Sequence, residues 1–317
     1  MASGAGEEKK SRILVVGATG YIGKHVVAAA ARLGHPTTAL VRDLSPSDQA
    51  KSQLLQSLRD AGVNLLHGDL YDHASLLAAV RDADVVISTL GALQIADQTK
   101  LIAAIKEAGN VSRFIPSEFG LDPDHTGAVE PVKSIFAGKA AVRRAVEEAG
   151  IPYTYVVSNY FAGYSLPVLG QNLPPAPPVD RVVILGDGKT KVVFVEEDDI
   201  GTLTVRAAVD PRAENKAVHI RPAANTVSHE ELIAVWEKKT GKKLERVYVP
   251  EDAVLKQIQE SPIPLNILLS IAHAAYIRGE TTTPLDPATD LEATELYPDV
   301  KYTTVDEYLD RLLSKST

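Results

Sequence analysis

Lys139 interrupts an apolar stripe and is the residue with the clearest potential for acid–base chemistry. Ile135, Lys139, Val142 and Val146 fall at i, i+4, i+7 and i+11, on one face of a helix predicted over residues 132–149. Burial of an unpaired amine costs free energy and lowers its pKa toward the range of a general base. The alternative is a lysine that reaches past the edge of the core to water, and the stripe alone does not separate the two.

The other charged residues of this helix are expected on its remaining faces, where they stay solvated: Lys133, Arg143, Arg144, Glu147 and Glu148.

Three glycines near the N-terminus have the spacing of a dinucleotide-binding turn. In RILVVGATGYIG, residues 12–23, an apolar run ends at Gly17, and Gly20 and Gly23 follow before an alanine-rich helical run. Gly17 permits a tight turn, Gly20 lets the backbone approach the phosphates, and Gly23 lets the helix lie close to the strand. The phosphates then face free N–H groups at the positive end of the helix dipole. The alternative is a glycine-rich turn without a ligand, which the flanking strand and helix disfavour.

Arg42 occupies the position that selects between the two nicotinamide dinucleotides. An NAD-binding chain usually has an acid at the end of the second strand, about 20 residues after the glycines, which binds the ribose 2′-hydroxyl. Here the sequence reads ALVRD, and an arginine can hold a 2′-phosphate through its planar fork. Lys51, at the start of the next helix, could add a second positive charge. The pattern favours NADP(H); the alternative is a solvated Arg42 beside an NAD-binding Asp43.

These residues come together only if strands and helices alternate along the chain. The sequence shows this alternation up to about residue 157. Strands are predicted over residues 13–16, 37–41, 63–67, 85–88, 113–115 and 153–157. Helices are predicted over residues 22–33, 49–61, 74–81, 98–108 and 132–149. This alternation predicts an α/β fold, a Rossmann doubly wound parallel sheet covered on both faces. Ligands of such sheets bind beyond the carboxyl ends of the strands.

The pattern changes after Phe161. Prolines over residues 174–178 predict an extended loop, and the sequence GDG at 186–188, between strand-like runs 181–185 and 192–195, predicts a hairpin. Helices are predicted over residues 198–209, 229–240, 252–260, 266–278 and 305–313. We therefore expect a disordered tail over residues 1–11 and an NADP-binding Rossmann domain over 12–160. A smaller α+β lobe over 161–317 would bind the substrate and is free to interleave with the first domain.

Composition narrows the class of protein. The net charge of −8 argues against a nucleic-acid-binding face, and the absence of cysteine excludes disulfides and thiolate catalysis. The eight histidines lack metal-ligand spacing, so no metal site is predicted. No segment approaches the ~18 consecutive apolar residues of a membrane span, and residues 1–11 lack an apolar signal core, so we expect a cytoplasmic protein. A homodimer is compatible with the sequence.

Lys139 also fits a family pattern. Short-chain dehydrogenases carry Tyr-x-x-x-Lys on a helix at about this place, where the tyrosine exchanges the substrate proton and the lysine holds the ribose. The tyrosine position is Ile135 in this chain. Carbonyl reduction with a tyrosine acid is therefore disfavoured, and Lys139 is the remaining candidate for acid–base work.

Longer blocks make the resemblance specific. The chain resembles the isoflavone-reductase-like group, an NmrA-like, atypical short-chain dehydrogenase family of plants that includes phenylcoumaran benzylic ether, pinoresinol–lariciresinol and isoflavone reductases. The matching blocks cover nearly the whole chain from Arg12: GATGYIG, VRD, FIPSEFG, FAGKAAVRRAVEEAGIPYTYV, SNYFAGY, GDGKTKVVFVEEDDIG, DPRAENKAVHIRP, WEKKTGKKLE and LYPDVKYTTVDEYL. Two features depart from the family pattern where the substrate pocket is expected. Ser165 stands where many relatives have an aromatic residue, and the prolines over 174–178 are unusual.

The resemblance implies roles for residues at matching positions, with Lys139 as the catalytic base. Cofactor contacts would come from Gly17, Thr19, Gly20, Tyr21, Ile22, Gly23, Arg42, Lys51, Ser88, Thr89, Gln94, Ser117, Glu118, Phe119, Lys139, Asn159 and Phe161. Substrate contacts would come from Phe161, Tyr164 and His273. The alternatives are a turn or cap carboxylate for Glu118, a core position for Phe161 and a hydrogen-bonded core histidine for His273.

On this interpretation the chain is an NADPH-dependent reductase of small phenolic molecules derived from phenylpropanoids. The best-fitting reaction opens the benzylic ether of a phenylcoumaran lignan such as dehydrodiconiferyl alcohol through a quinone methide, with Lys139 removing the para-phenol proton. The alternatives are pinoresinol–lariciresinol or isoflavone reduction and, from another class, a non-catalytic NADP-sensing regulator of the NmrA type. A sensor needs no base, so Lys139 argues against it.

Overall fold

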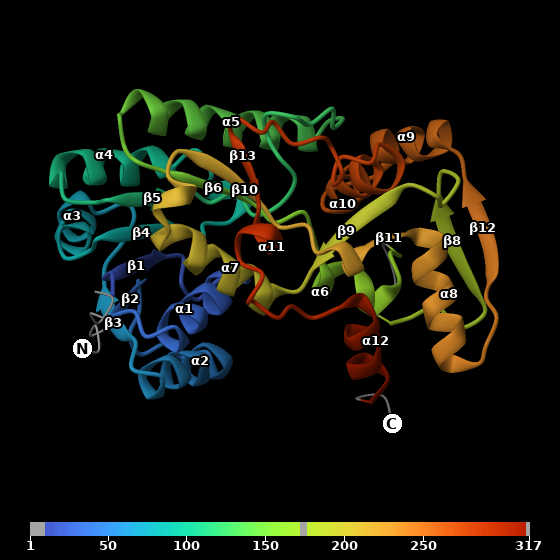
Figure 1. The fold of residues 1–317 in the computed structure, drawn as a ribbon, viewed down its shortest axis with the longest axis horizontal. Coiled ribbons are helices and arrows are strands. Elements are labelled where there is room, and N and C mark those ends of the chain that lie inside the picture. Colours follow the sequence, from blue (N-terminus) through green and yellow to red (C-terminus); the bar gives the residue numbers. More distant parts are fainter. Residues whose placement is uncertain (1–9, 172–175, 315–317) are drawn as a thin grey trace, which may run out of the picture.

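The structure is a computed structural model that describes residues 10–171 and 176–314 (Figure 1). Most of the predicted N-terminal tail, residues 1–9, lies outside the described residues, as do Pro174 and Pro175 of the predicted proline-rich loop. Within the described part of the chain, no helix combines the length and the apolar content that crossing a bilayer requires.

A parallel sheet forms the centre of the first half of the chain. Its strand order is β3-β2-β1-β4-β5, and each strand pairs in parallel with its neighbours. The strands are β1 (Ile13–Val16), β2 (Thr37–Val41), β3 (Asn64–His67), β4 (Val85–Ser88) and β5 (Arg113–Ile115). The predicted doubly wound α/β fold is confirmed.

The second half of the chain extends the same sheet. The backbone N–H of Phe114 on β5 donates to the carbonyl of Pro152, beside β6 (Thr154–Val157). β6 pairs in parallel with β10 (Lys216–His219), which pairs in parallel with β13 (Asp290–Glu292). β10 and β13, from beyond residue 160, thus join this sheet, so the two halves of the chain interleave.

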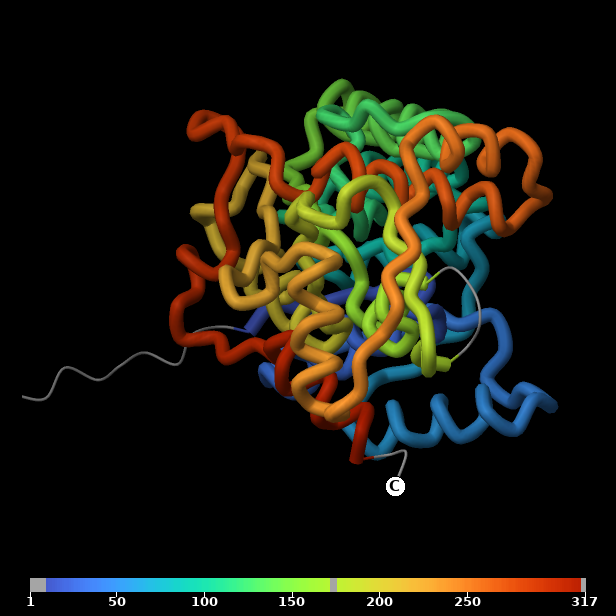
Figure 2. The backbone as a smooth tube through the Cα atoms, turned by 90° about the vertical axis from the view of Figure 1, so that its right-hand side faces the viewer, coloured from blue at the N-terminus to red at the C-terminus, as the bar shows by residue number. Residues whose placement is uncertain are grey.

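Helices cover both faces of the sheet because its strands alternate side chains between two apolar cores. Ile13 and Val15 belong to the core under α1, α2 and α7, whereas Leu14 and Val16 belong to the core under α3, α4 and α5. The helices are α1 (Gly23–Arg32), α2 (Gln49–Asp60), α3 (His73–Arg81), α4 (Gln98–Ala108), α5 (Val132–Glu148) and α7 (Glu197–Val209). Seen from the side in Figure 2, α5 (green) and α2 (light blue) lie at opposite ends of the molecule, as they do in Figure 1.

Smaller sheets and helices make up the rest of the second half. β9 (Lys191–Val195) pairs with β11 (Thr226–Ser228) and β7 (Tyr160–Phe161), and β8 (Arg181–Leu185) pairs with β12 (Glu245–Val249). The helices are α6 (Ala162–Ser165), α8 (His229–Thr240), α9 (Glu251–Glu260), α10 (Leu265–Ala272), a π-helical turn (His273–Ile277), α11 (Ala293–Leu296) and α12 (Val305–Ser314). The helix predicted over 266–278 is thus divided at His273.

The predicted hairpin at residues 186–188 is wrong. The glycine turn does connect β8 to β9, but the two strands pair with other strands. The N–H of Gly186 donates to the carbonyl of Val249 at 2.8 Å, which continues the β8–β12 ladder to the very end of β8. The backbone of β8 therefore pairs with β12, a strand far along the chain, and not with β9.

Candidate functional site

The glycine turn has the close contacts that its sequence predicts. Gly17 has a φ of +85°, and a Cβ there would lie 2.7 Å from the carbonyl oxygen of Thr89. A Cβ on Gly23 would lie 2.2 Å from the carbonyl oxygen of Gly17, so only glycine lets α1 start this close to β1. The N–H and hydroxyl of Thr89 both donate to the Val16 carbonyl, at 2.8 and 3.0 Å. These bonds join the ends of β1 and β4.

A cavity of about 190 Å³ opens beyond the carboxyl ends of β1, β2, β3 and β4. We call it the nucleotide cavity. Its lining includes six residues predicted to contact the cofactor: Gly17, Thr19, Gly20, Arg42, Thr89 and Gln94. Gly20 presents backbone without a side chain, and the exposed Arg42 directly follows β2. A bare glycine turn and a cation at the rim fit a dinucleotide that carries phosphates at both places.

Several other predicted cofactor residues lie outside this lining. Ile22 and Ser88 are buried, Lys51 is exposed in the first turn of α2, and Tyr21 lies against Tyr164 with a ring-centroid distance of 4.4 Å. The lining also contains residues that the sequence analysis missed, 68–71 after β3. The rule that ligands bind beyond strand ends, applied to β3 as well, would have found them.

An apolar pocket of about 340 Å³ is bounded by helices from both halves of the chain. We call it the substrate pocket. Its walls are Ala92, Phe119, Gly120, Leu121, Val132, Ile135, Phe136, Lys139, Asn159, Tyr160, Phe161, Tyr164, Ile267, Leu268 and Ile271. Lys139 is the charged side chain in this lining. The helix predicted over 266–278 was expected to contact the substrate through His273, but the residues of α10 that line the pocket were not predicted. Two of them, Ile267 and Ile271, have the i, i+4 spacing of one helix face.

Lys139 lines the substrate pocket and is buried, with 9% of its surface exposed. Its Nζ donates to the main-chain carbonyl of Glu118 at 2.5 Å and lies 5.3 Å from the centroid of the Phe136 ring. Burial lowers the pKa of Lys139 to about 8, against the opposing charge of Glu118. The apolar stripe therefore predicted the burial correctly, and the alternative of a solvated amine is wrong.

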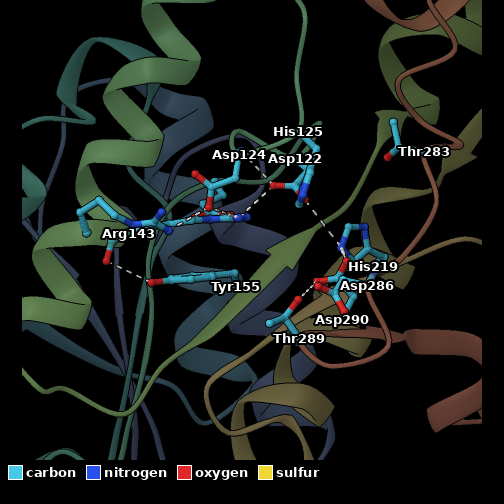
Figure 3. Close-up of polar contacts among 12 residues, drawn as sticks. Asp122, Asp124, His125, Arg143, Tyr155, His219, Thr283, Asp286, Thr289 and Asp290 are labelled. Atoms are coloured by element: carbon cyan, nitrogen blue, oxygen red, sulfur yellow. Dashed lines mark hydrogen bonds and ion pairs between the residues drawn. The ribbon is translucent and has the colours of Figure 1, made fainter.

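Arg143 is buried, so the expectation that the other charged side chains of α5 are solvated is wrong for this residue. Only 3% of it is exposed, and its guanidinium binds both carboxylate oxygens of Glu118, at 2.7 and 2.6 Å. It also stacks on the ring of Tyr155 at 4.4 Å (Figure 3). Burial raises the pKa of the Glu118 carboxyl, and the Arg143 charge acts in the opposite direction. Glu118 thus faces Arg143 with its side chain and Lys139 with its carbonyl.

The ion pair belongs to a larger buried network (Figure 3). Arg143 also donates to Asp122 at 2.9 Å and to Asp124 at 3.1 Å, and Nε2 of His219 lies 3.9 Å from Asp122. Burial acts to raise the pKa of Asp122, but the charge of Arg143 and the hydrogen bonds from His125 and the Asp124 N–H together outweigh it, and the net pKa is lowered. The loop after β5 is therefore fixed by charge-assisted bonds to α5.

Two wall residues have left-handed backbone conformations. Phe119 has a φ of +40° and Asn159 a φ of +56°, and each lies in a loop after a sheet strand. The N–H of Asn159 donates to the Gly120 carbonyl at 3.0 Å, and its side-chain amide donates to the Ile220 carbonyl at 2.9 Å. Such conformations persist only where surrounding bonds enforce them, and they are frequent at functional sites.

Ser117 and His273 have structural partners. The Ser117 hydroxyl donates to the Leu90 carbonyl at 2.7 Å, which ties the loops after β4 and β5. His273 is buried, bonds Glu251 of α9 at 2.9 Å and is absent from the pocket lining. Its position agrees with the alternative of a hydrogen-bonded core histidine. Ser165 is likewise buried, 2.6 Å from the Tyr276 hydroxyl, so its departure from the family pattern lies behind the pocket wall.

Among the described residues, no group of three or more His, Asp or Glu side chains is arranged to hold a metal ion. The two cavities lie side by side, because Ala92 lines the substrate pocket and Gln94, in the same 3-10 turn, lines the nucleotide cavity. Fold and site thus define a dinucleotide-binding α/β protein with a buried amine in an adjoining apolar pocket.

The chain belongs to the NmrA-like family, whose model matches residues 9–309. It is 68% identical to the isoflavone reductase homolog IRL of Zea mays, covering 96% of this chain and 99% of the relative. It is 59% identical to phenylcoumaran benzylic ether reductase Pyrc5 of Pyrus communis, with coverages of 96% and 99%. It is also 57% identical to eugenol synthase 1 of Petunia hybrida, with coverages of 95% and 98%.

Solved structures agree with this placement. A crystal structure of isoflavone reductase is 50% identical, with a TM-score of 0.92 and coverages of 96% of this chain and 99% of that chain. The structure of AtPrR2 with NADP+ and (+)pinoresinol is 42% identical, with a TM-score of 0.91 and the same coverages. The cofactor expected from the glycine turn and Arg42 is the one held in that structure.

The Arg143–Glu118 pair gives a stability prediction. Replacing Arg143 by Met should lower the free energy of unfolding by about 3–5 kcal/mol, because the Glu118 carboxyl stays buried without its partner. The matched control is Arg144→Met on the same helix. Arg144 is 58% exposed in its ion pair with Asp124, so its loss should cost less than about 1 kcal/mol. Urea unfolding of both variants is the measurement, and equal losses would contradict the assignment.

Proposed function

We propose that the chain is an NADPH-dependent reductase of phenolic substrates derived from phenylpropanoids. The observation that carries the proposal is the buried amine of Lys139 in an apolar pocket that adjoins a nucleotide cavity. The names of the relatives support an oxidoreductase. The degrees of sequence identity do not indicate one substrate, because a benzylic ether reductase at 59% and a eugenol synthase at 57% are almost equally similar to this chain.

The chain's own residues fit NADP(H). The turn over residues 17–23 would hold the pyrophosphate, and Arg42 would hold the 2′-phosphate. Lys51, in the first turn of α2 and outside the cavity lining, would add only a more distant positive charge. When bound, the reduced nicotinamide supplies a hydride. Phe119, Asn159 and Phe161, at the ends of the adjoining loops, would lie along the nicotinamide side.

Lys139 would act as a general base on the substrate phenol. Its pKa of about 8 leaves part of the amine neutral near neutral pH, and one of its N–H bonds is occupied by the Glu118 carbonyl. The neutral nitrogen takes the para-phenol proton, and the phenolate expels the benzylic ether oxygen to give a quinone methide. Addition of hydride at the benzylic carbon restores the aromatic ring. Lys139 then returns its proton to the phenolate, and water protonates the expelled oxygen.

The pocket favours a two-ring lignan, and the finer proposal is a phenylcoumaran benzylic ether reductase. Its volume of about 340 Å³ lies in the range of ~300–1,000 Å³ that suits ligands of that size, and its walls are largely apolar and aromatic. Ile135 stands where a short-chain dehydrogenase has its tyrosine acid, which agrees with a reaction that requires a base. Pinoresinol–lariciresinol and isoflavone reduction are the alternative reactions.

Replacing Lys139 by Met should lower kcat for dehydrodiconiferyl alcohol by roughly 10²- to 10⁴-fold, because the general base is lost. NADPH binding, followed by its fluorescence, should persist. Lys139→Arg is the matched control: it keeps a cation but cannot deprotonate near neutral pH, so it should be equally inactive.

Assays with a set of phenolic compounds distinguish the proposed reaction from the alternative reactions and from a non-catalytic sensor. The para-O-methyl ether of the lignan should bind wild type without being reduced. Turnover of pinoresinol or an isoflavone in place of the phenylcoumaran would change the substrate assignment. Tight NADPH binding with no turnover of any phenolic compound would favour a sensor. Near-normal turnover by Lys139→Met would contradict the role of the base.

Arg42 gives a prediction for cofactor choice. Replacing it by Ala should weaken NADPH binding roughly 10- to 100-fold, the equivalent of one charge-assisted contact, and leave NADH binding unchanged. Lys51→Ala is the companion variant, and because Lys51 lies outside the cavity lining, its effect should be much smaller. Titration of each variant with both cofactors is the measurement. An equal loss for NADPH and NADH in Arg42→Ala would contradict a 2′-phosphate contact.

A further inference from the structure

One buried carboxylate joins the glycine turn to the wall of the substrate pocket. Glu197, at the start of α7, is 5% exposed. Its Oε1 accepts two hydrogen bonds, one from the Tyr21 hydroxyl at 2.5 Å and one from the backbone N–H of Gly163 at 3.0 Å. Tyr21 lies between Gly20 and Gly23 in the glycine turn, and Gly163 lies in α6 beside Tyr164. Two segments far apart in the sequence are therefore held by a single side chain.

The same segments are joined by stacked aromatic rings. The centroids of Tyr21 and Tyr164 are 4.4 Å apart with an interplanar angle of 14°, and those of Phe161 and Tyr164 are 5.7 Å apart at 7°. Phe161 and Tyr164 line the substrate pocket, and Tyr164 is 60% exposed. A ring so exposed is not fixed by the core, so its stacking on Tyr21, the nearer ring, and on Phe161 positions it.

Gly163 is required for this arrangement. A Cβ at that position would lie 2.5 Å from the Tyr21 hydroxyl and 2.6 Å from Oε1 of Glu197. Its φ is not in the left-handed region, so the requirement is for space and not for backbone freedom. The absence of a side chain at Gly163 is what lets Tyr21 and Glu197 meet.

We propose that Tyr21 and Glu197 are positioning residues that couple binding of the dinucleotide to binding of the aromatic substrate. The inference rests on the proposed function. Gly20 lines the nucleotide cavity, and the next residue, Tyr21, turns its ring to the substrate side. A dinucleotide that orders the turn therefore also orders Tyr21, and through it Tyr164. Because coupling between two sites is reciprocal, the phenolic ligand must tighten cofactor binding by the same factor.

The test measures binding without turnover, with NADP+ and dehydrodiconiferyl alcohol as ligands. Calorimetry gives the lignan Kd with and without saturating NADP+, and their ratio is the coupling factor. We expect a factor of at least ~5 in wild type. Tyr21→Phe keeps the ring but loses the bond to Glu197, so its factor should fall. Tyr21→Leu loses both contacts, so its factor should approach one. The ratio cancels any direct change in affinity for either ligand alone.

Tyr248→Phe is the matched control, because Tyr248 also donates to a carboxylate, that of Glu230, but lies on β12 away from both cavities. Its coupling factor should equal that of wild type. A wild-type factor that both Tyr21 variants retain would overturn this inference alone. Wild-type protein that binds no phenolic ligand would overturn the proposed function and the inference with it.

Discussion

The site depends on one hydrogen bond, from the amine of Lys139 to the carbonyl of Glu118. An amine is a useful base near neutral pH only where burial keeps part of it uncharged, and a buried amine still needs a partner for its N–H groups. The carbonyl meets that need without adding a second charge at the amine. Its position is fixed because the Glu118 carboxylate is bound by Arg143, one turn beyond Lys139 on the same helix.

The fold brings this amine into a pocket that adjoins the nucleotide cavity. Both cavities lie where the parallel strands end, and the turn Ala92–Gln94 contributes to each. One wall of the substrate pocket comes from α5 of the sheet region, and the facing wall comes from α10, late in the chain. Since β10 and β13 extend the central sheet, the later segments are built onto the same frame that carries the glycine turn. One sheet thus positions both the pocket that holds Lys139 and the nucleotide cavity.

Local patterns predicted much of this, and non-local contacts account for the errors. Helices α4 and α8 have the bounds predicted for them, residues 98–108 and 229–240, and each is followed by a glycine in the left-handed conformation. Helical periodicity found Lys139, but it placed Arg143 in solvent because the periodicity of a helix cannot show that a loop covers its other face. The prediction of a hairpin after β8 was wrong for a similar reason: the pairing partner of β8 is β12, which is distant in the sequence. His273 lies outside the pocket lining and bonds Glu251 on another helix, a contact that the sequence of its own helix does not show.

The pH dependence of kcat/KM for dehydrodiconiferyl alcohol, at saturating NADPH, tests the role of Lys139 most directly. Burial lowers the pKa of Lys139 to about 8, and only the neutral amine accepts a proton. The rate constant should therefore rise about tenfold per pH unit below pH 8 and level off above it. A profile that is flat from pH 6 to pH 9, or one that falls as the pH rises through this range, would contradict a buried neutral amine as the base.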